Sequence, residues 1–277
     1  MTSTRERQRA AARARLEKEM AERAARARKR RQTQAVVGAG VVLLLVVAGT
    51  AWLASNLIGD DSGTENVARD GGSAQCDWIE IPAGERTPTT KDVGLPGAEQ
   101  SRTGTQTMTI TTNLGPITAK VDQSAVPCTA GSFIHLAEKN FFDNTKCHRL
   151  VTEGIKVLQC GDPSATGNGW RETDGTGGPS YRMSEENLPT DMRPPYPEGV
   201  IAMANSGQPA STGSQFFIVY GDSPLDPNYT VLGTITGGMD LVKEIAAAGD
   251  DGAFAQQAGG GHPKKEVVIT DLTMAPA

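Results

Sequence analysis

A stretch of apolar and amide residues in the carboxyl-terminal half has the composition of a peptide-binding site. Two apolar pieces, residues 200–204 and 216–220, predict buried strands, and a loop rich in Asn, Gly, Ser and Pro separates them. The side chains of Asn205 and Gln215 flank this loop. Apolar walls with a few fixed amide groups suit an uncharged, extended peptide, although an ordinary hairpin with a polar loop has a similar pattern.

Further blocks of sequence give this stretch a context. In chain order they are His148-Arg149, Gln159-x-Gly161-Asp162, Gly175-Thr176-Gly177-Gly178, Met203-Ala204-Asn205 and Gly213-Ser214-Gln215-Phe216-Phe217-Ile218. Five ordered blocks are a more specific signal than any one of them alone. Together they resemble the cyclophilin family of peptidyl-prolyl isomerases, and the resemblance covers residues 105–273.

The resemblance implies rotation about the peptide bond that precedes proline. The uncatalysed barrier is about 18–20 kcal/mol because amide resonance must be lost. No bond breaks, so an enzyme must bind the twisted amide better than the planar one. Arg149 is expected to donate a hydrogen bond toward the proline nitrogen, since arginine stays charged and offers donors in a fixed geometry.

The resemblance also implies which residues surround Arg149. Gln159 is expected to orient the arginine, and Asn205 with Ala204 to bind the main chain of the peptide. The expected catalytic residues are Arg149, Gln159 and Asn205, and the expected substrate contacts are Lys156, Val157, Met203, Ala204, Gln215, Phe217, Leu225 and Tyr229.

Lys156 departs from the family pattern, which usually has a pocket Phe at this position. Either a cation replaces an aromatic wall, or the neighbouring Ile155 fills the pocket instead. The departure leaves two functions open. The first is an isomerase, and the second is a catalytically weak module that binds Pro-containing segments of a partner.

Motifs for other chemistry are missing. The histidines His135, His148 and His262 are scattered without metal-ligand spacing, and His148 is expected to be a structural histidine with satisfied hydrogen bonds. The glycine block at 175–178 lacks the Lys-Ser/Thr of a phosphate loop, and no Gly-x-Ser-x-Gly elbow is present. We therefore expect neither a metal nor a cofactor.

The elements that position these residues are predicted to be mainly β. Strands are predicted over 107–112, 117–121, 146–151, 156–159, 200–204, 216–220, 230–235 and 267–274, and helices over 129–139, with a Thr cap, and 239–248. Many short strands favour a closed antiparallel barrel, which leaves no exposed edge. The resemblance implies eight strands with a helix over each end.

The amino-terminal part has a different composition. Residues 1–31 carry 12 basic and 4 acidic residues, a net charge of +8, and the remainder, with 15 basic and 28 acidic residues, has −13. Residues 35–58 are uncharged and apolar, longer than the roughly 20 residues that cross a bilayer. The positive-inside rule then places the tail in the cytoplasm and the acidic body outside. A signal peptide cleaved near residues 49–51 is the alternative.

The chain therefore divides into a basic cytoplasmic tail (1–34), a transmembrane helix (35–58), a linker with an irregular extension that packs on the domain (59–102), and a cyclophilin-like domain (103–277). We expect a monomer at the cell membrane whose domain assists the folding of extracytoplasmic proteins. The acidic body has no basic face for phosphates, so no nucleic-acid partner is expected. A structural envelope protein, using its basic tail for a cytoplasmic partner, is a third possibility.

The four cysteines favour disulfides if the domain lies outside the cytoplasm. Cys76, Cys128, Cys147 and Cys160 allow three complete pairings, and the sequence does not choose among them. A hairpin turning at residues 153–154 would place Cys147 opposite Cys160 and leave Cys76 for Cys128. A slip of one residue in the register would undo this pairing, and four free thiols are the alternative.

Overall fold

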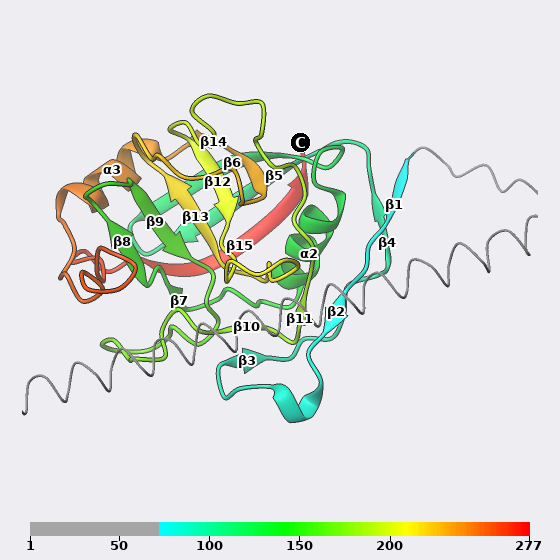
Figure 1. Ribbon diagram of the computed structural model, residues 1–277, viewed down its shortest axis with the longest axis horizontal. Coiled ribbons are helices and arrows are strands. Elements are labelled where there is room, and N and C mark those ends of the chain that lie inside the picture. The colour runs from blue at the N-terminus through cyan, green and yellow to red at the C-terminus, as the bar shows by residue number, and fades with distance from the viewer. Residues whose placement is uncertain (1–71) are drawn as a thin grey trace, which may run out of the picture. The chain divides into compact units, whose positions relative to one another are not determined.

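The computed structural model describes residues 72–277, which are coloured in Figure 1. The predicted tail (1–34) and transmembrane segment (35–58) lie outside the described residues, as does most of the predicted linker. Among residues 72–277, none of the helices has both the length and the apolar character that crossing a membrane requires.

One large antiparallel sheet organises the domain. Its strands are β5 (Thr105–Thr112), β6 (Gly115–Asp122), β7 (Thr145–Lys146), β8 (Arg149–Val151), β9 (Val157–Cys160), β12 (Val200–Met203), β13 (Phe216–Val219), β14 (Val231–Gly237) and β15 (Val268–Pro276). They lie in the order β7-β15-β5-β6-β14-β12-β13-β9-β8, and Figure 1 shows the sheet strongly curled. Seven of the eight predicted strands appear in it with bounds shifted by one or two residues, and the eighth, predicted over 146–151, is divided.

The predicted closed barrel of eight strands needs correction. The strand predicted over 146–151 is divided into β7 and β8 by Cys147 and His148, which gives a 9-stranded sheet. β7 pairs with β15, whereas β8 pairs with β9, so the two ends of the sheet are successive pieces of one segment. Within the described residues no ladder joins β7 to β8, and the sheet is a curled half-barrel.

The two predicted helices are confirmed as α2 (Pro127–Glu138) and α3 (Met239–Ala247), and a short 3-10 helix, η1 (Ala83–Glu85), was not predicted. α2 packs against β15 and β6, and α3 packs against β6. Pro127 occupies the first turn of α2. The N–H groups of this turn have no acceptor within the helix, so the N–H that proline lacks costs the helix no hydrogen bond.

The predicted Thr cap of the first helix is wrong, because α2 begins before Thr129. Val126 is the N-cap residue and makes no side-chain cap. The carboxylate of Glu186 takes this role from elsewhere in the chain. It accepts hydrogen bonds from the backbone N–H groups of Cys128 (3.2 Å) and Thr129 (2.8 Å), and from the Thr129 hydroxyl (2.7 Å). A negative charge at a helix N-terminus is also favoured by the helix dipole.

Side chains on the two faces of the sheet enter two apolar clusters. Phe216 belongs to the main core, where its ring lies 5.9 Å from that of Phe133 on α2. Phe217 points the other way, into a smaller cluster with Val157 and Tyr196. Neighbouring residues of a strand face opposite sides of the sheet, so the Phe-Phe pair serves both clusters.

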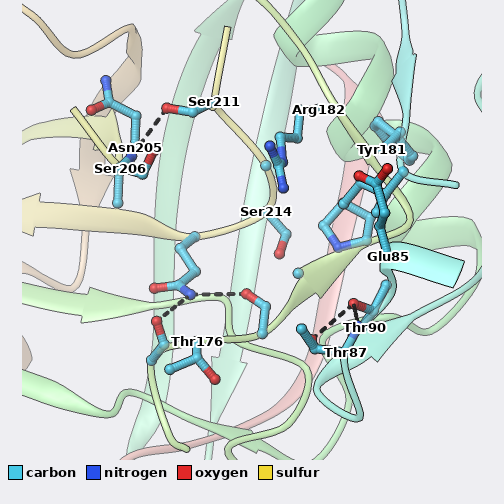
Figure 2. A pocket seen from close by; sticks show the side chains of 18 of the residues that line it. Glu85, Thr87, Thr90, Thr176, Tyr181, Arg182, Asn205, Ser206, Ser211 and Ser214 are labelled. Atoms are coloured by element: carbon cyan, nitrogen blue, oxygen red, sulfur yellow. Dashed lines mark hydrogen bonds between the residues drawn. The ribbon is translucent and has the colours of Figure 1, made fainter. Parts of the chain in front are cut away.

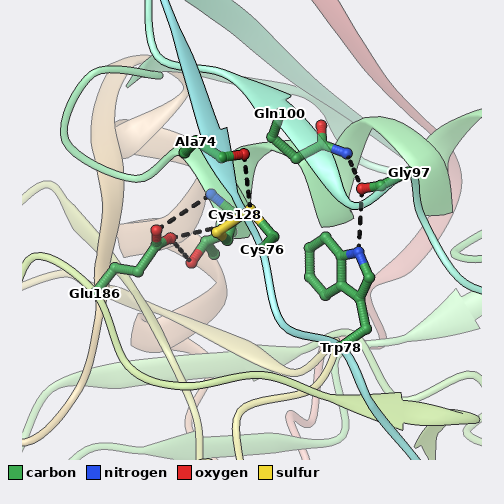
Figure 3. Close-up of a disulfide and its surroundings, with 8 residues drawn as sticks. Ala74, Cys76, Trp78, Gly97, Gln100, Cys128 and Glu186 are labelled. Carbon is green, nitrogen blue, oxygen red and sulfur yellow. Dashed lines mark hydrogen bonds between the residues drawn. A yellow bond between two sulfur atoms is a disulfide. The ribbon is translucent and has the colours of Figure 1, made fainter. Parts of the chain in front are cut away.

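The extension contains three short ladders: one pairs its own two ends, and the other two join it to the domain. β1 (Ser73–Gln75) pairs with β4 (Glu99–Ser101), β2 (Ile79–Glu80) with β11 (Tyr181–Arg182), and β3 (Thr90–Lys91) with β10 (Gly178–Pro179). Figure 1 shows the extension in cyan, beside α2 at its start. A disulfide between Cys76 and Cys128 ties it to α2, as Figure 3 shows, and a second joins Cys147 to Cys160. Of the three possible pairings, the structure has the one that the hairpin geometry favours.

Candidate functional site

A cavity of about 330 Å³ opens over the edge of the sheet formed by β8, β9 and β13. Most of the predicted site residues line it: Arg149, Val157, Gln159, Ala204, Asn205, Phe217, Leu225 and Tyr229. The sheet brings the central ones together by its register. Arg149 pairs with Gln159, and Gln159 pairs with Phe217 on the next strand. Directly paired residues share one face of a sheet, so these three side chains stand in a row.

Arg149 is held by oxygen acceptors that surround its guanidinium. Its Nη1 donates to Gln159 Oε1 (3.1 Å), its Nε donates to the Gly259 carbonyl (3.0 Å), and its Nη2 donates to the Ala258 carbonyl. Burial lowers the pKa of Arg149, although a guanidinium keeps its charge at any physiological pH. A fixed positive charge with N–H donors therefore faces the cavity.

The amide of Gln159 continues this network into the loop that carries the glycine block. Its Nε2 donates to Gln215 Oε1 (2.9 Å), and Gln215 Nε2 donates in turn to the carbonyls of Gly175 and Gly177, both at 2.9 Å. The orientation of each amide is set by the next one, so Gln159 presents its oxygen to Arg149. The predicted pairing of Gln159 with the arginine is thus present in the structure.

Asn205 is fixed by two hydrogen bonds of its side chain. Its Nδ2 donates to the Asn228 carbonyl (2.9 Å), and its Oδ1 accepts from the Gly207 N–H (3.0 Å). The backbone N–H of Ala204 donates to the Gln215 carbonyl (2.8 Å). The main chain at 204–205 is thereby held at the rim of the cavity.

Three predicted contacts lie elsewhere. The Lys156 ammonium donates to the Thr152 carbonyl (2.8 Å) outside the cavity, and Ile155 lines the cavity instead. Of the two alternatives that the sequence leaves open at this hairpin, the structure has the apolar one. Met203 is fully buried in the main core opposite Phe216. Gln215 lines a neighbouring cavity rather than this one.

His148 lies at the side of the cavity and differs from the expected satisfied histidine. It is 2% exposed, and neither ring nitrogen has a hydrogen-bond partner within residues 72–277. Burial lowers its pKa to about 4, against the opposing effect of the carboxylates of Asp162 and Asp174. The imidazole is therefore neutral at pH 7. Gly175 packs directly on it, since a Cβ there would lie 3.1 Å from the ring.

Sequence reasoning missed the residues that loops bring to the cavity. Phe254 and Ala258 come from the loop after α3, and Asp174 comes from the loop before the glycine block. One signal was available: Phe254 is an aromatic residue within a loop rich in Ala, Gly and Gln. Nothing in the periodicity of these loops indicates where their side chains point.

A second cavity, of about 400 Å³, adjoins the first and is shown in Figure 2. The two share the residues Gln159, Gly175, Ala204 and Asn205 in their linings. Hydroxyl and amide groups make up much of the second lining, in contrast to the apolar residues around Phe217. Together the cavities form a groove with an apolar and a polar part.

Comparisons with known proteins agree with this geometry. The family model described as cyclophilin type peptidyl-prolyl cis-trans isomerase/CLD matches residues 107–274. Curated relatives called probable peptidyl-prolyl cis-trans isomerase B are 43% identical over 182 residues in Mycobacterium leprae and 42% identical over 179 residues in Mycobacterium tuberculosis. The alignments cover 61% and 60% of this chain, and 57% and 54% of the relatives. The chain thus spans little more than half the length of the curated relatives that it matches.

Solved structures also resemble the chain. A cyclophilin type peptidyl-prolyl cis-trans isomerase of Cryptosporidium parvum is 25% identical, with a TM-score of 0.51, over 62% of this chain and 99% of that one. A crystal structure of the same protein in the presence of the dipeptide Ala-Pro is 24% identical, with a TM-score of 0.50 and the same coverage, and this likeness shows the fold.

Proposed function

The chain belongs to the cyclophilin-type peptidyl-prolyl cis-trans isomerases, and from this membership we propose that it accelerates rotation about X-Pro bonds in polypeptides. The observation that carries the proposal is the pairing of Arg149 with Gln159 beside an apolar pocket formed by Ile155, Phe217 and Leu225. The pocket suits the proline ring, and the guanidinium stands where the amide next to that ring would lie.

An enzyme accelerates the rotation if it binds the twisted amide more strongly than the planar amide. A hydrogen bond from Arg149 to the proline nitrogen is available only after the nitrogen has lost its conjugation, because the planar amide has no lone pair to accept it. Gln159 holds the guanidinium in position through its oxygen. The main chain at 204–205 fixes the peptide while the bond turns.

The alternative function, a weak module that binds Pro-containing segments, is favoured by one feature of the loop after α3. The carbonyls of Ala258 and Gly259 accept hydrogen bonds from two of the nitrogens of Arg149. A guanidinium with these donors engaged has fewer left for a substrate. The measurement of turnover separates the two functions.

A protease-coupled isomerisation assay with the full chain in detergent tests the proposal. We expect acceleration on Ala-Pro peptides, and Arg149→Ala should lower kcat/KM by about 10²–10³-fold, as loss of one preorganised donor does in other enzymes. Arg102→Ala is the matched control, because Arg102 is exposed and lines neither cavity. Peptide binding without acceleration in the wild type would establish the binding module instead.

We also propose that the domain acts outside the cytoplasm on folding proteins, as a monomer anchored through residues 35–58 with residues 1–34 inside. Residues 59–102 would then be linker and extension, and 103–277 the isomerase domain. The split of charge, the apolar run and the two disulfides support this, since disulfides persist in oxidising compartments. External protease should digest a carboxyl-terminal tag on intact cells. A protected tag together with reduced cysteines would refute this arrangement.

A further inference from the structure

The amino-terminal extension forms one wall of the second cavity. Ile81, Glu85, Thr87 and Thr90 line it, and all four precede residue 107, where the match to the family model begins. Figure 2 shows Glu85, Thr87 and Thr90 across the space from Asn205, Ser206 and Ser211. The wall is therefore built by residues outside the part of the chain that the family model matches.

The wall is fixed to the domain at both ends of the segment. β2 pairs with β11 just before the lining residues, and β3, which contains the last of them, Thr90, pairs with β10. Between these ladders, Arg86 Nε donates to the Ile81 carbonyl (2.9 Å), and its guanidinium forms ion pairs with Glu80 (3.1 Å) and Asp92 (2.5 Å). A wall held in this way requires little ordering when a ligand binds.

The second cavity continues directly from the proposed proline pocket. The shared residues Gln159, Ala204 and Asn205 stand between the two spaces. An extended peptide advances about 3.3 Å per residue, so residues close to the X-Pro bond reach the second cavity when proline occupies the first. The ligand of the second cavity is then a flanking part of the same polypeptide.

The chemistry of the lining indicates what side chain fits. Hydroxyl oxygens of Thr87, Thr90 and Ser214 can accept a hydrogen bond from a polar group, whereas the Ser214 proton is already donated to the Gly161 carbonyl (2.8 Å). Glu85 and Arg182 line the cavity as exposed charges, and within the described residues neither forms an ion pair. Glu85 is thus available to a basic side chain of a ligand, and Arg182 to an acidic one.

From these observations we propose that the extension is part of the substrate groove. It accepts a polar or charged side chain that flanks the X-Pro bond, and Glu85 raises the preference for a basic over an acidic side chain at that position. The inference rests on the proposed function, because the proline pocket sets the position of the flanking residue.

The test compares kcat/KM for X-Pro peptides that carry Lys, Gln or Glu at the second or third position on either side of the proline, with the full chain at low ionic strength. Glu85→Gln should lower the ratio of Lys to Glu peptides about twofold to fivefold, the range that exposed ion pairs produce, and Glu85→Lys should lower it further. Added salt should reduce the preference in the wild type. Glu99→Gln removes the same charge from β4, outside both cavities, and is the control.

An unchanged ratio in both Glu85 variants, with an isomerase that turns over, would overturn the inference and leave the proposed function standing. If the wild type accelerates no peptide, the proposed function fails. The inference can then still be tested by calorimetry, which gives the ratio of the Kd values for the Lys and Glu peptides. The inference is supported if the wild type binds the Lys peptide more tightly than the Glu peptide and the Glu85→Lys variant has the opposite preference. A failure of every peptide to bind would refute both.

Discussion

The disulfide between Cys76 and Cys128 should contribute more to stability than any other single link in the extension. It joins residues 52 apart in sequence. Closing a loop of this length lowers the entropy of the unfolded chain, and this raises the free energy of the unfolded state by about 4 kcal/mol at 25 °C. The double variant Cys76→Ser/Cys128→Ser should therefore lower the free energy of unfolding by up to about 4 kcal/mol. Urea denaturation of the oxidised wild type and of the variant measures this difference.

The same variant should loosen the extension before the domain unfolds. Apart from the disulfide, the extension is held to the domain by two ladders of two residues each and by contacts such as that of the Trp78 ring with Tyr181, whose ring centroids lie 5.5 Å apart. Figure 3 shows Trp78 close to the cross-link, with its Nε1 donating to the Gly97 carbonyl (3.1 Å) within the extension. Segments with few buried contacts open at free energies well below the global value. Amide exchange within residues 77–104 should accelerate in the variant.

The second disulfide provides the matched control. Cys147 and Cys160 are 13 residues apart, so Cys147→Ser/Cys160→Ser should cost about 3 kcal/mol in the same relation and leave exchange in the extension unchanged. A loss of less than about 1 kcal/mol in the Cys76/Cys128 variant, with the extension still protected, would refute the reasoning. It would mean that the ladders alone hold the extension.

Three further predictions concern single residues. The pKa of His148 is about 4 in the folded chain and near 6.5 unfolded, so the unfolded state binds the extra proton between these values. The wild type should therefore lose up to about 3 kcal/mol of unfolding free energy as the pH falls from 6.5 to 4, and none of this loss should occur above pH 6.5. In urea titrations at several pH values, His148→Asn should show a weaker dependence of the unfolding free energy on pH. Glu186→Ala leaves two N–H groups of α2 without their acceptor and should lower the unfolding free energy by about 2 kcal/mol. Gly161 has φ +92°, and a Cβ there would lie 2.4 Å from the Ser214 carbonyl, so Gly161→Ala should destabilise by at least about 2 kcal/mol in thermal or urea unfolding.

Each of these predictions has a control or an outcome that contradicts it. Equal pH slopes for the wild type and His148→Asn would show that His148 is not the group that titrates. Glu172→Ala, an exposed carboxylate in a loop, should leave stability unchanged where Glu186→Ala does not. Gly84→Ala introduces a methyl group into open space, so equal effects at Gly84 and Gly161 would contradict the steric argument.

The strands and the centre of the site could be predicted because local patterns determine them. Buried and less buried residues alternate along the whole of β5, so its sequence already indicates which face enters the core. Arg149 and Gln159 could be placed together because a hairpin sets their register. The start of α2 could not be predicted from its own sequence, since its cap is Glu186, which is 57 residues from Thr129.

In the hairpin between β8 and β9, the sequence did not determine which side chain faces the cavity. A turn in which the Ile155 N–H donates to the Glu153 carbonyl (3.0 Å) decides that Ile155 faces the cavity and Lys156 does not. Side chains alternate along a strand, so a difference of one residue in this turn exchanges an apolar wall for a cation. Phe254 lies in a loop with no periodicity, where only tertiary contacts set the direction of a side chain.

Each disulfide supports a different part of the groove. Cys147 and Cys160 flank the paired Arg149 and Gln159, so their cross-link opposes the one-residue slip that would turn the arginine away from the cavity. The link from Cys76 to α2 restrains the extension whose residues wall the second cavity. Loss of the first link should therefore reduce turnover on all X-Pro peptides. Loss of the second should reduce only the discrimination between flanking side chains, and the two serine double variants separate these effects.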